Sequence, residues 1–144
     1  IDADTIQKGL LNSKWPGRFE IFNHNIILDG AHNIGGIEAL ANTLKQIYKG
    51  KYIKCLVSIM FDKEHEKIIE VLDHVCDEIY FTEFEYERRA DASLLFEESH
   101  HKNKKVYSDY KKIFNDLKNL KENEILVVTG SLYFISTIRK LLVK

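Results

Sequence analysis

The sequence lacks the features that mark several large functional classes. Its 144 residues carry a formal net charge of −1, so no basic excess predicts a nucleic-acid partner or attachment to a membrane surface. Its apolar runs, of which residues 125–128 are typical, are far too short to span a bilayer, and no signal-peptide pattern opens the chain. We therefore expect a cytoplasmic protein with neither a nucleic-acid nor a membrane partner.

Cysteine, methionine and the common phosphate-binding motifs are also scarce or missing. The two cysteines, Cys55 and Cys76, lie in no Cys-x-x-Cys or Cys/His pattern, so we expect buried, reduced thiols and no zinc site. The chain contains neither GxxxxGK[ST] nor GxGxxG, so any nucleotide site on it is partial. It begins at Ile1 and its only methionine is Met60, which suggests a fragment or a processed chain.

What the sequence does contain is an alternation of apolar runs and amphipathic segments. Strands are expected at 19–22, 25–28, 52–59, 79–81, 105–107 and 125–128. Helices are expected at 4–12, from 35 to about 48, around 68–75, at 91–98, and around 113–120 and 134–141. This alternation predicts one α/β domain, a Rossmann-like three-layer fold with a mixed, mostly parallel sheet of about six strands and an N-terminal β-hairpin.

Polar loops follow three of the predicted strands, at residues 29–33, 58–63 and 129–133. The carboxyl ends of parallel strands meet at one edge of a sheet, so these loops are expected to converge. In the first loop a carboxylate, an imidazole and an amide, from Asp29, His32 and Asn33, precede a helix, whose N-terminus suits an anion. Asp and Asn are also preferred helix caps, so spacing alone leaves capping and ligand binding equally open.

The remaining polar positions have simple structural interpretations beside the functional ones. Lys63 is interpreted first as part of a solvated loop, with an anion contact as the alternative. Ser131 can cap the last helix and still offer its hydroxyl to a carboxylate. Arg18 follows a Pro-Gly turn and is by default a surface residue, although a guanidinium suits phosphate. Two candidate ligands in the first loop are too few for zinc, so no metal site is predicted. Three acidic residues are expected to form a solvated loop face: Glu83, Glu85 and Glu87.

Several short segments together resemble one protein family. They are Trp15-Pro16-Gly17-Arg18-Phe19-Glu20, Ile27-Leu28-Asp29-Gly30-Ala31-His32-Asn33, Asp62-Lys63, Arg89-Ala90 and Val128-Thr129-Gly130-Ser131-Leu132-Tyr133. In order and spacing they are similar to the C-terminal domain of folylpolyglutamate synthase/dihydrofolate synthase and, more distantly, to that of the Mur ligases. The resemblance covers nearly the whole chain. It implies an interdomain linker over 1–17 and a Mur-ligase-type C-terminal domain over 18–144.

The resemblance implies an ATP-dependent amide ligase that adds L-glutamate to dihydropteroate or folate through an acyl phosphate. ATP and Mg²⁺ would be held mainly by a larger N-terminal ATPase domain that this chain lacks, so the chain alone is expected to be inactive. Carried over by residue, the resemblance assigns ATP binding to Arg18, Asp29 and His32, with His32 also catalytic. It assigns glutamate binding to Asn33, Lys63 and Ser131.

Three positions depart from the family pattern, and other functions stay open. Ile34 and Arg88 stand where relatives tend to have Pro, and Ser58 replaces an expected Gly; the role of Arg89 is left open. The alternative to the ligase is a stand-alone Rossmann-like module that binds a nucleotide or an amino acid without catalysis. A purely structural interaction domain is a third interpretation.

Overall fold

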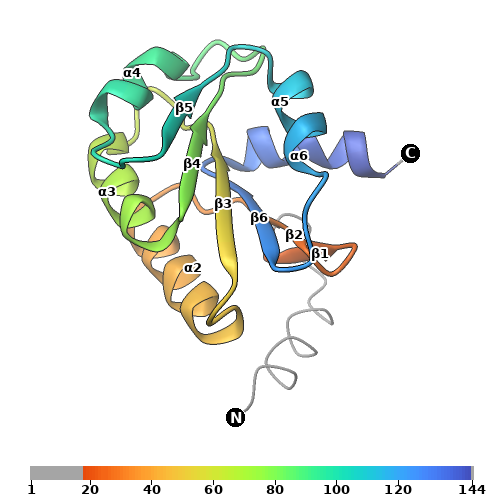
Figure 1. Ribbon diagram of the computed structural model, residues 1–144. Coiled ribbons are helices and arrows are strands. Elements are labelled where there is room, and N and C mark those ends of the chain that lie inside the picture. The colour runs from red at the N-terminus through yellow and green to blue at the C-terminus, as the bar shows by residue number, and fades with distance from the viewer. Residues whose placement is uncertain (1–17, 144) are drawn as a thin grey trace.

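A six-stranded mixed sheet forms the middle layer of the domain (Figure 1). The computed structural model describes residues 18–143; the helix predicted at 4–12 and the linker at 1–17 lie outside the described residues. The strands are β1 (Glu20–Phe22), β2 (Ile26–Asp29), β3 (Tyr52–Val57), β4 (Glu78–Phe81), β5 (Lys104–Val106) and β6 (Glu124–Thr129). Their order is β1-β2-β6-β3-β4-β5, and only β1 runs antiparallel to its neighbour. The predicted fold class is confirmed.

The first two strands form the predicted hairpin. Asn23 and His24 at its turn have φ angles of 50° and 56°. Positive φ at both central residues is the turn geometry that matches the twist of antiparallel strands. The turn aligns Glu20 with Leu28 and so places the start of β1 beside the end of β2.

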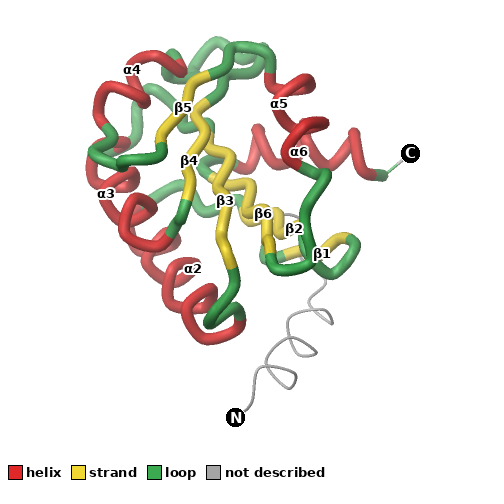
Figure 2. The backbone as a smooth tube through the Cα atoms, viewed as in Figure 1, coloured by secondary structure: helices red, strands yellow, loops and turns green. Residues whose placement is uncertain are grey.

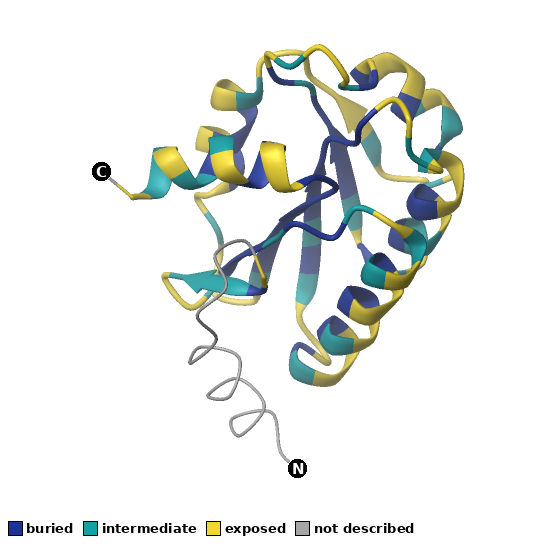
Figure 3. Ribbon diagram, turned by 180° about the vertical axis from the view of Figure 1, so that it is seen from behind, coloured by how far each residue is buried: buried dark blue, intermediate teal, exposed yellow. Residues whose placement is uncertain are grey.

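Helices cover both faces of the sheet (Figures 1 and 2). One face carries α2 (Ile34–Ile47), α3 (His65–Val75) and α4 (Ala92–Glu98); the other carries α5 (Tyr110–Leu117) and α6 (Leu132–Leu142). Neighbouring residues of β6 divide between the two cores, because Val127 packs with the α2–α4 side and Val128 with the α5–α6 side. A strand buried on both faces reads as an unbroken apolar run. Figure 3 shows these buried strands between helices whose outer surfaces are exposed.

The two cysteines form a disulfide, so the prediction of reduced thiols is wrong. Cys55 lies in β3, and Cys76 caps the end of α3, which packs against the same face. The two Cα atoms are 6.2 Å apart, within the usual range for a disulfide. No local sequence pattern predicts this pair, because the two residues come together only when α3 packs over the sheet.

Candidate functional site

Three loops meet at the carboxyl edge of the sheet, as predicted. The last strand along the chain, β6, lies between β2 and β3. Its register pairs Thr129 with Asp29 on one side and with Val57 on the other. The loops that follow these three strands are therefore neighbours in space although they are far apart in sequence.

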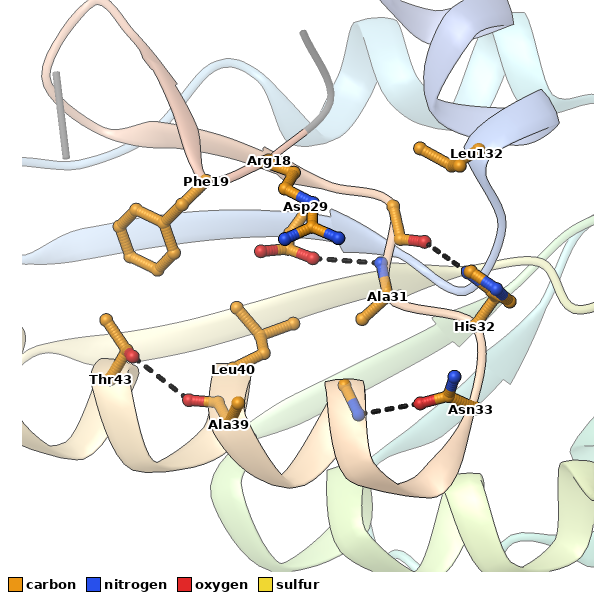
Figure 4. Close-up of a pocket in the computed structure, with 12 residues that line it drawn as sticks. Arg18, Phe19, Asp29, Ala31, His32, Asn33, Ala39, Leu40, Thr43 and Leu132 are labelled. Carbon is orange, nitrogen blue, oxygen red and sulfur yellow. Dashed lines mark hydrogen bonds between the residues drawn. The ribbon is translucent and has the colours of Figure 1, made fainter. Parts of the chain in front are cut away.

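A cavity of about 480 Å³ opens beside β2 at this edge (Figure 4). Four of the predicted site residues line it: Arg18, Asp29, His32 and Asn33. The other lining residues are Phe19, Gly30, Ala31, Gly36, Ala39, Leu40, Thr43 and Leu132. The cavity thus combines charged and amide groups with an apolar wall from α2 and Phe19, which is typical of a small-molecule site.

Asp29 provides the half-buried acidic group of the cavity. The Ala31 N–H donates to Asp29 Oδ1 at 2.8 Å. Burial raises the pKa of the Asp29 carboxyl above its usual value, and the Ala31 and Phe19 N–H groups and the Arg18 guanidinium oppose that rise. Figure 4 shows Arg18 reaching over the same part of the cavity. A carboxylate held in this way is a strong, fixed acceptor for a hydroxyl group.

His32 presents one ring nitrogen to the protein. Its Nδ1 lies 3.1 Å from the Gly30 carbonyl oxygen. A carbonyl only accepts, so Nδ1 carries the proton in the neutral ring and Nε2 keeps a lone pair. The ring is half-buried and borders the cavity. His32 can therefore accept a proton or a hydrogen bond through Nε2.

Asn33 begins α2 and also lines the cavity. Its Oδ1 accepts the Gly36 N–H at 2.8 Å, which confirms the capping interpretation. The cap engages the amide oxygen, and the side-chain NH₂ group is a donor that the cap does not use. The two interpretations left open by the sequence are thus compatible at this residue.

The start of α6 is built around a glycine and a serine. Gly130 has φ of +116°, and a Cβ placed there would lie 2.3 Å from the Ser58 carbonyl oxygen. Ser131 Oγ accepts the N–H groups of Tyr133 and Phe134, so the predicted helix cap is confirmed. Ser131 is only 1% exposed and is not among the cavity residues, and neither is Lys63, which is half-buried before α3. Both lie on neighbouring loops of the same edge.

Several lining residues were not predicted as site residues. Leu40 and Thr43 follow Gly36 at spacings of four and three, so the three residues lie on one face of α2. This spacing could have predicted that Leu40 and Thr43 line the cavity. Leu132 directly follows the predicted Ser131. Phe19 has a φ of 48°, a backbone conformation that no spacing pattern indicates.

The acidic segment after β4 is structural, and Arg89 is part of it. Glu83 accepts the N–H of Ala92 at 2.8 Å at the start of α4. Arg89 lies 3.4 Å from the Glu83 carboxylate and 3.2 Å from that of Asp91. Glu83 is therefore partly buried and bonded, and its prediction as a solvated loop residue is wrong, whereas Glu85 and Glu87 are exposed.

Two further properties of the described residues bear on the kind of site. Between residues 18 and 143, no group of three or more His, Cys, Asp or Glu side chains is placed to hold a metal ion. In the same part of the chain, no helix has the length and apolar character needed to cross a membrane.

The fold and the cavity together define a class of protein. A doubly wound sheet with a mixed polar and apolar cavity at its carboxyl edge is typical of nucleotide-binding α/β domains. The family described as Mur ligase, glutamate ligase domain, matches residues 17–132, and the chain belongs to this family.

Individual relatives agree with this assignment. The chain is 37% identical over 143 residues to dihydrofolate synthase/folylpolyglutamate synthase of Bacillus subtilis, covering 97% of the chain and 33% of that protein. A bifunctional folylpolyglutamate synthase/dihydrofolate synthase from Yersinia pestis, solved with AMPPNP and Mn, is 27% identical with a TM-score of 0.81 over 96% of this chain and 34% of its own. Another bifunctional enzyme structure, with Mn, AMPPNP and L-glutamate bound, is 26% identical with a TM-score of 0.80 over the same shares. The chain thus spans about a third of the length of these relatives.

Proposed function

We propose that this chain is the C-terminal domain of an ATP-dependent ligase that adds L-glutamate to dihydropteroate or folate. The observation that carries the proposal is the cavity that unites Arg18, Asp29, His32 and Asn33 in a member of the glutamate ligase domain family. The division into a linker over 1–17 and a domain over 18–144 is part of the same proposal. So is the cytoplasmic location.

The cavity fits part of a nucleotide. Phe19 and Leu40 belong to the apolar wall against which a base would lie, and the half-buried Asp29 carboxylate is an acceptor for ribose hydroxyls. Arg18 supplies a guanidinium, which pairs with phosphate oxygens through two parallel hydrogen bonds. These groups fit one side of ATP, and bound ATP would supply the phosphoryl group that activates the substrate carboxylate.

The amino-acid side of the reaction is assigned to the loops around α2, α3 and α6. Lys63 would pair with a glutamate carboxylate, and Asn33 and Ser131 would donate to it from their amide and hydroxyl groups. His32 Nε2 would accept a proton from the glutamate ammonium and so free the amine to attack, because the Gly30 carbonyl holds the opposite ring nitrogen protonated. Positioning the amine for attack is the main contribution of these residues.

The remainder of the site is proposed to lie in the upstream part of the full-length protein. The chain has no GxxxxGK[ST] motif, and the residues at this edge would face the phosphate loop and the Mg²⁺ site of an N-terminal ATPase domain. Closure of the two domains would bring Arg18 and Asp29 to the nucleotide once substrates are loaded.

The test uses the intact parent protein with ATP, Mg²⁺, L-glutamate and either dihydropteroate or folate. We expect ADP formation that requires both glutamate and the pteroate substrate, and an Arg18→Ala variant that loses at least about tenfold of it. Lys140→Ala, an exposed cation on α6 away from the cavity, is the matched control. Tight ATP or glutamate binding without turnover would instead favour the stand-alone binding module.

A further inference from the structure

The Cys55–Cys76 disulfide has no part in the site described above. Cys55 lies within β3 and is fully buried, whereas Cys76 follows α3 at the amino edge of the sheet and is 7% exposed. The bond closes a ring of chain, residues 55–76, which contains the end of β3, the loop that follows it and all of α3. Lys63, which is assigned to glutamate binding, belongs to this ring. The disulfide therefore constrains the segment that presents Lys63.

A second cavity gives one of the two cysteines a route to solvent. It has a volume of about 440 Å³ and lies at the amino edge of the sheet, opposite the cavity described above. Cys76 lines this cavity together with His74, His101 and Lys102, whereas Cys55 is not among its lining residues. Thiol–disulfide exchange requires that a thiolate reach one of the two sulfur atoms. An external thiol can therefore attack the bond at Cys76.

The chain next to Cys76 is bonded to its surroundings independently of the sulfur atoms. The Asp77 N–H donates to the Ile53 carbonyl oxygen at 2.7 Å, and the Ile53 N–H donates to Asp77 Oδ2 at 2.7 Å. His101 Nε2 lies 2.7 Å from the Cys76 carbonyl oxygen. These contacts do not need the disulfide, so they keep the two thiols near one another after reduction. The bond can therefore form again.

Reduction changes the packing of α3. Two thiols must separate to van der Waals distance, and both cysteines belong to the close-packed core on the α2–α4 side. The helix contributes Ile68, Ile69 and Leu72 to the same core, so it shifts against β3 as a unit. Lys63 lies two residues before the start of α3 and is displaced with it.

We propose that the Cys55–Cys76 pair is a reversible redox switch that sets the affinity of the Lys63 loop for glutamate; this inference rests on the proposed function. Disulfides of cytoplasmic proteins are usually transient and serve redox sensing or catalysis. The oxidised state is the one described here, in which the closed ring holds Lys63 in place. The reduced state binds glutamate more weakly.

The switch exchanges electrons with a dithiol. One thiolate of the dithiol bonds to Cys76 Sγ, and the disulfide breaks with its electron pair on Cys55 Sγ, which takes up a proton. The second thiolate of the dithiol then bonds to the sulfur of the first, and Cys76 leaves and is protonated. The dithiol is thus oxidised to a disulfide, and the two protons it loses equal the two that the cysteines gain. Exchange with an external disulfide reverses both steps.

Thiol trapping on the intact parent protein tests the exchange site. The native protein is reduced with dithiothreitol, treated briefly with iodoacetamide and digested for mass spectrometry. We expect reduction without denaturant, and several-fold more alkylation of Cys76 than of Cys55, because only Cys76 lines the cavity. A disulfide that is reduced only after denaturation overturns the proposal, because it would then be a permanent crosslink. Faster alkylation of Cys55 also overturns it.

Kinetics of the intact parent test the effect on the site. Reduction with dithiothreitol should raise the KM for glutamate about fivefold, and reoxidation with glutathione disulfide should restore it. The KM for ATP should stay the same in both states, because the residues assigned to ATP lie on the other side of the site. Cys76→Ser should keep the high KM for glutamate under both conditions.

The outcomes separate this proposal from the function on which it rests. Equal KM values for glutamate in the oxidised and reduced wild type overturn the switch. A redox response that persists in Cys76→Ser also overturns it, because other cysteines of the parent would then be responsible. If the variant does not fold, the recovery of the wild-type KM on reoxidation decides the question. A parent without glutamate-dependent ADP formation contradicts the proposed function instead, and thiol trapping still decides the exchange site.

Discussion

At the scale of single residues, the Asp29 carboxylate lowers the stability of the fold but lies where a ligand can bind to it. Burial raises the pKa of its carboxyl, so the folded chain binds this proton more tightly than the unfolded chain. Stability from this group is therefore highest at low pH and falls as the pH rises from the unfolded pKa through the folded one. At neutral pH the ionised carboxylate therefore destabilises the fold, and it is at the same time available as a hydrogen-bond acceptor for a ligand.

We expect Asp29→Asn to stabilise the domain and impair the enzyme. The amide still accepts the Ala31 N–H but carries no partly desolvated charge, so the free energy of unfolding should rise by about 0.5–2 kcal/mol at pH 7. The gain should shrink as the pH is lowered towards 4 in denaturant titrations. Turnover by the intact protein should fall by at least about tenfold. A variant that is both less stable and fully active would contradict this account of Asp29.

His32→Gln tests the proposed proton acceptor. The intact enzyme should lose about a hundredfold of kcat, while the KM for ATP changes little. His74→Gln is the control, because His74 Nδ1 also meets a backbone carbonyl, that of Glu70, but lies exposed on α3. A kcat close to that of the wild type in His32→Gln would assign the proton transfer to another group.

Thr82 carries a hydroxyl that the fold does not use. It is fully buried, and within the described residues its Oγ1 has no hydrogen-bond partner. Thr82→Val keeps the shape and removes the orphaned group, so the free energy of unfolding should rise by about 1 kcal/mol. Thr137→Val removes a hydroxyl that donates to the Tyr133 carbonyl and should give no such gain. Destabilisation by Thr82→Val would reveal an ordered water bonded to the hydroxyl.

At the scale of elements, the junction between β6 and α6 depends on close backbone approach. Gly130→Ala combines a left-handed φ with a Cβ that would overlap the Ser58 carbonyl oxygen, so chemical denaturation should show a loss of about 2 kcal/mol or more. Gly50→Ala is the matched control: it also has a positive φ, +85°, but open space around the added Cβ. It should cost about 1 kcal/mol. Equal losses would mean that φ alone, and not the contact with Ser58, requires glycine at 130.

The elements also show what the sequence can and cannot predict. Spacings of three and four along α2 and the unbroken apolar run of β6 are local patterns, and they correctly predicted these elements and their layer. The convergence of three loops followed from the general rule for parallel strands. The Cys55–Cys76 pair, the Glu83 cap on α4 and the Phe19 wall of the cavity depend on how distant segments pack. No local pattern encodes such contacts, so the sequence missed them.

At the scale of the whole molecule, a complete fold carries an incomplete site. Apolar clusters fill both sides of the sheet, so we expect residues 1–144 alone to fold and to melt cooperatively by circular dichroism. The same protein should form no ADP with ATP, Mg²⁺, glutamate and folate, because it lacks a phosphate loop. Glutamate-dependent ADP formation by the isolated chain would show that the site is complete without a partner domain.

The central place of β6 has a consequence for biosynthesis. Of the strands in this sheet, the ribosome makes β6 last, yet its neighbours on the two sides are β2 and β3. Until β6 has emerged from the exit tunnel, β2 and β3 expose the backbone groups that will later pair with it. Until then, the sheet of the nascent domain has a gap between β2 and β3. Asp29 and Thr129 become neighbours only when β6 fills that gap, so the cavity edge is completed only after β6 has been made.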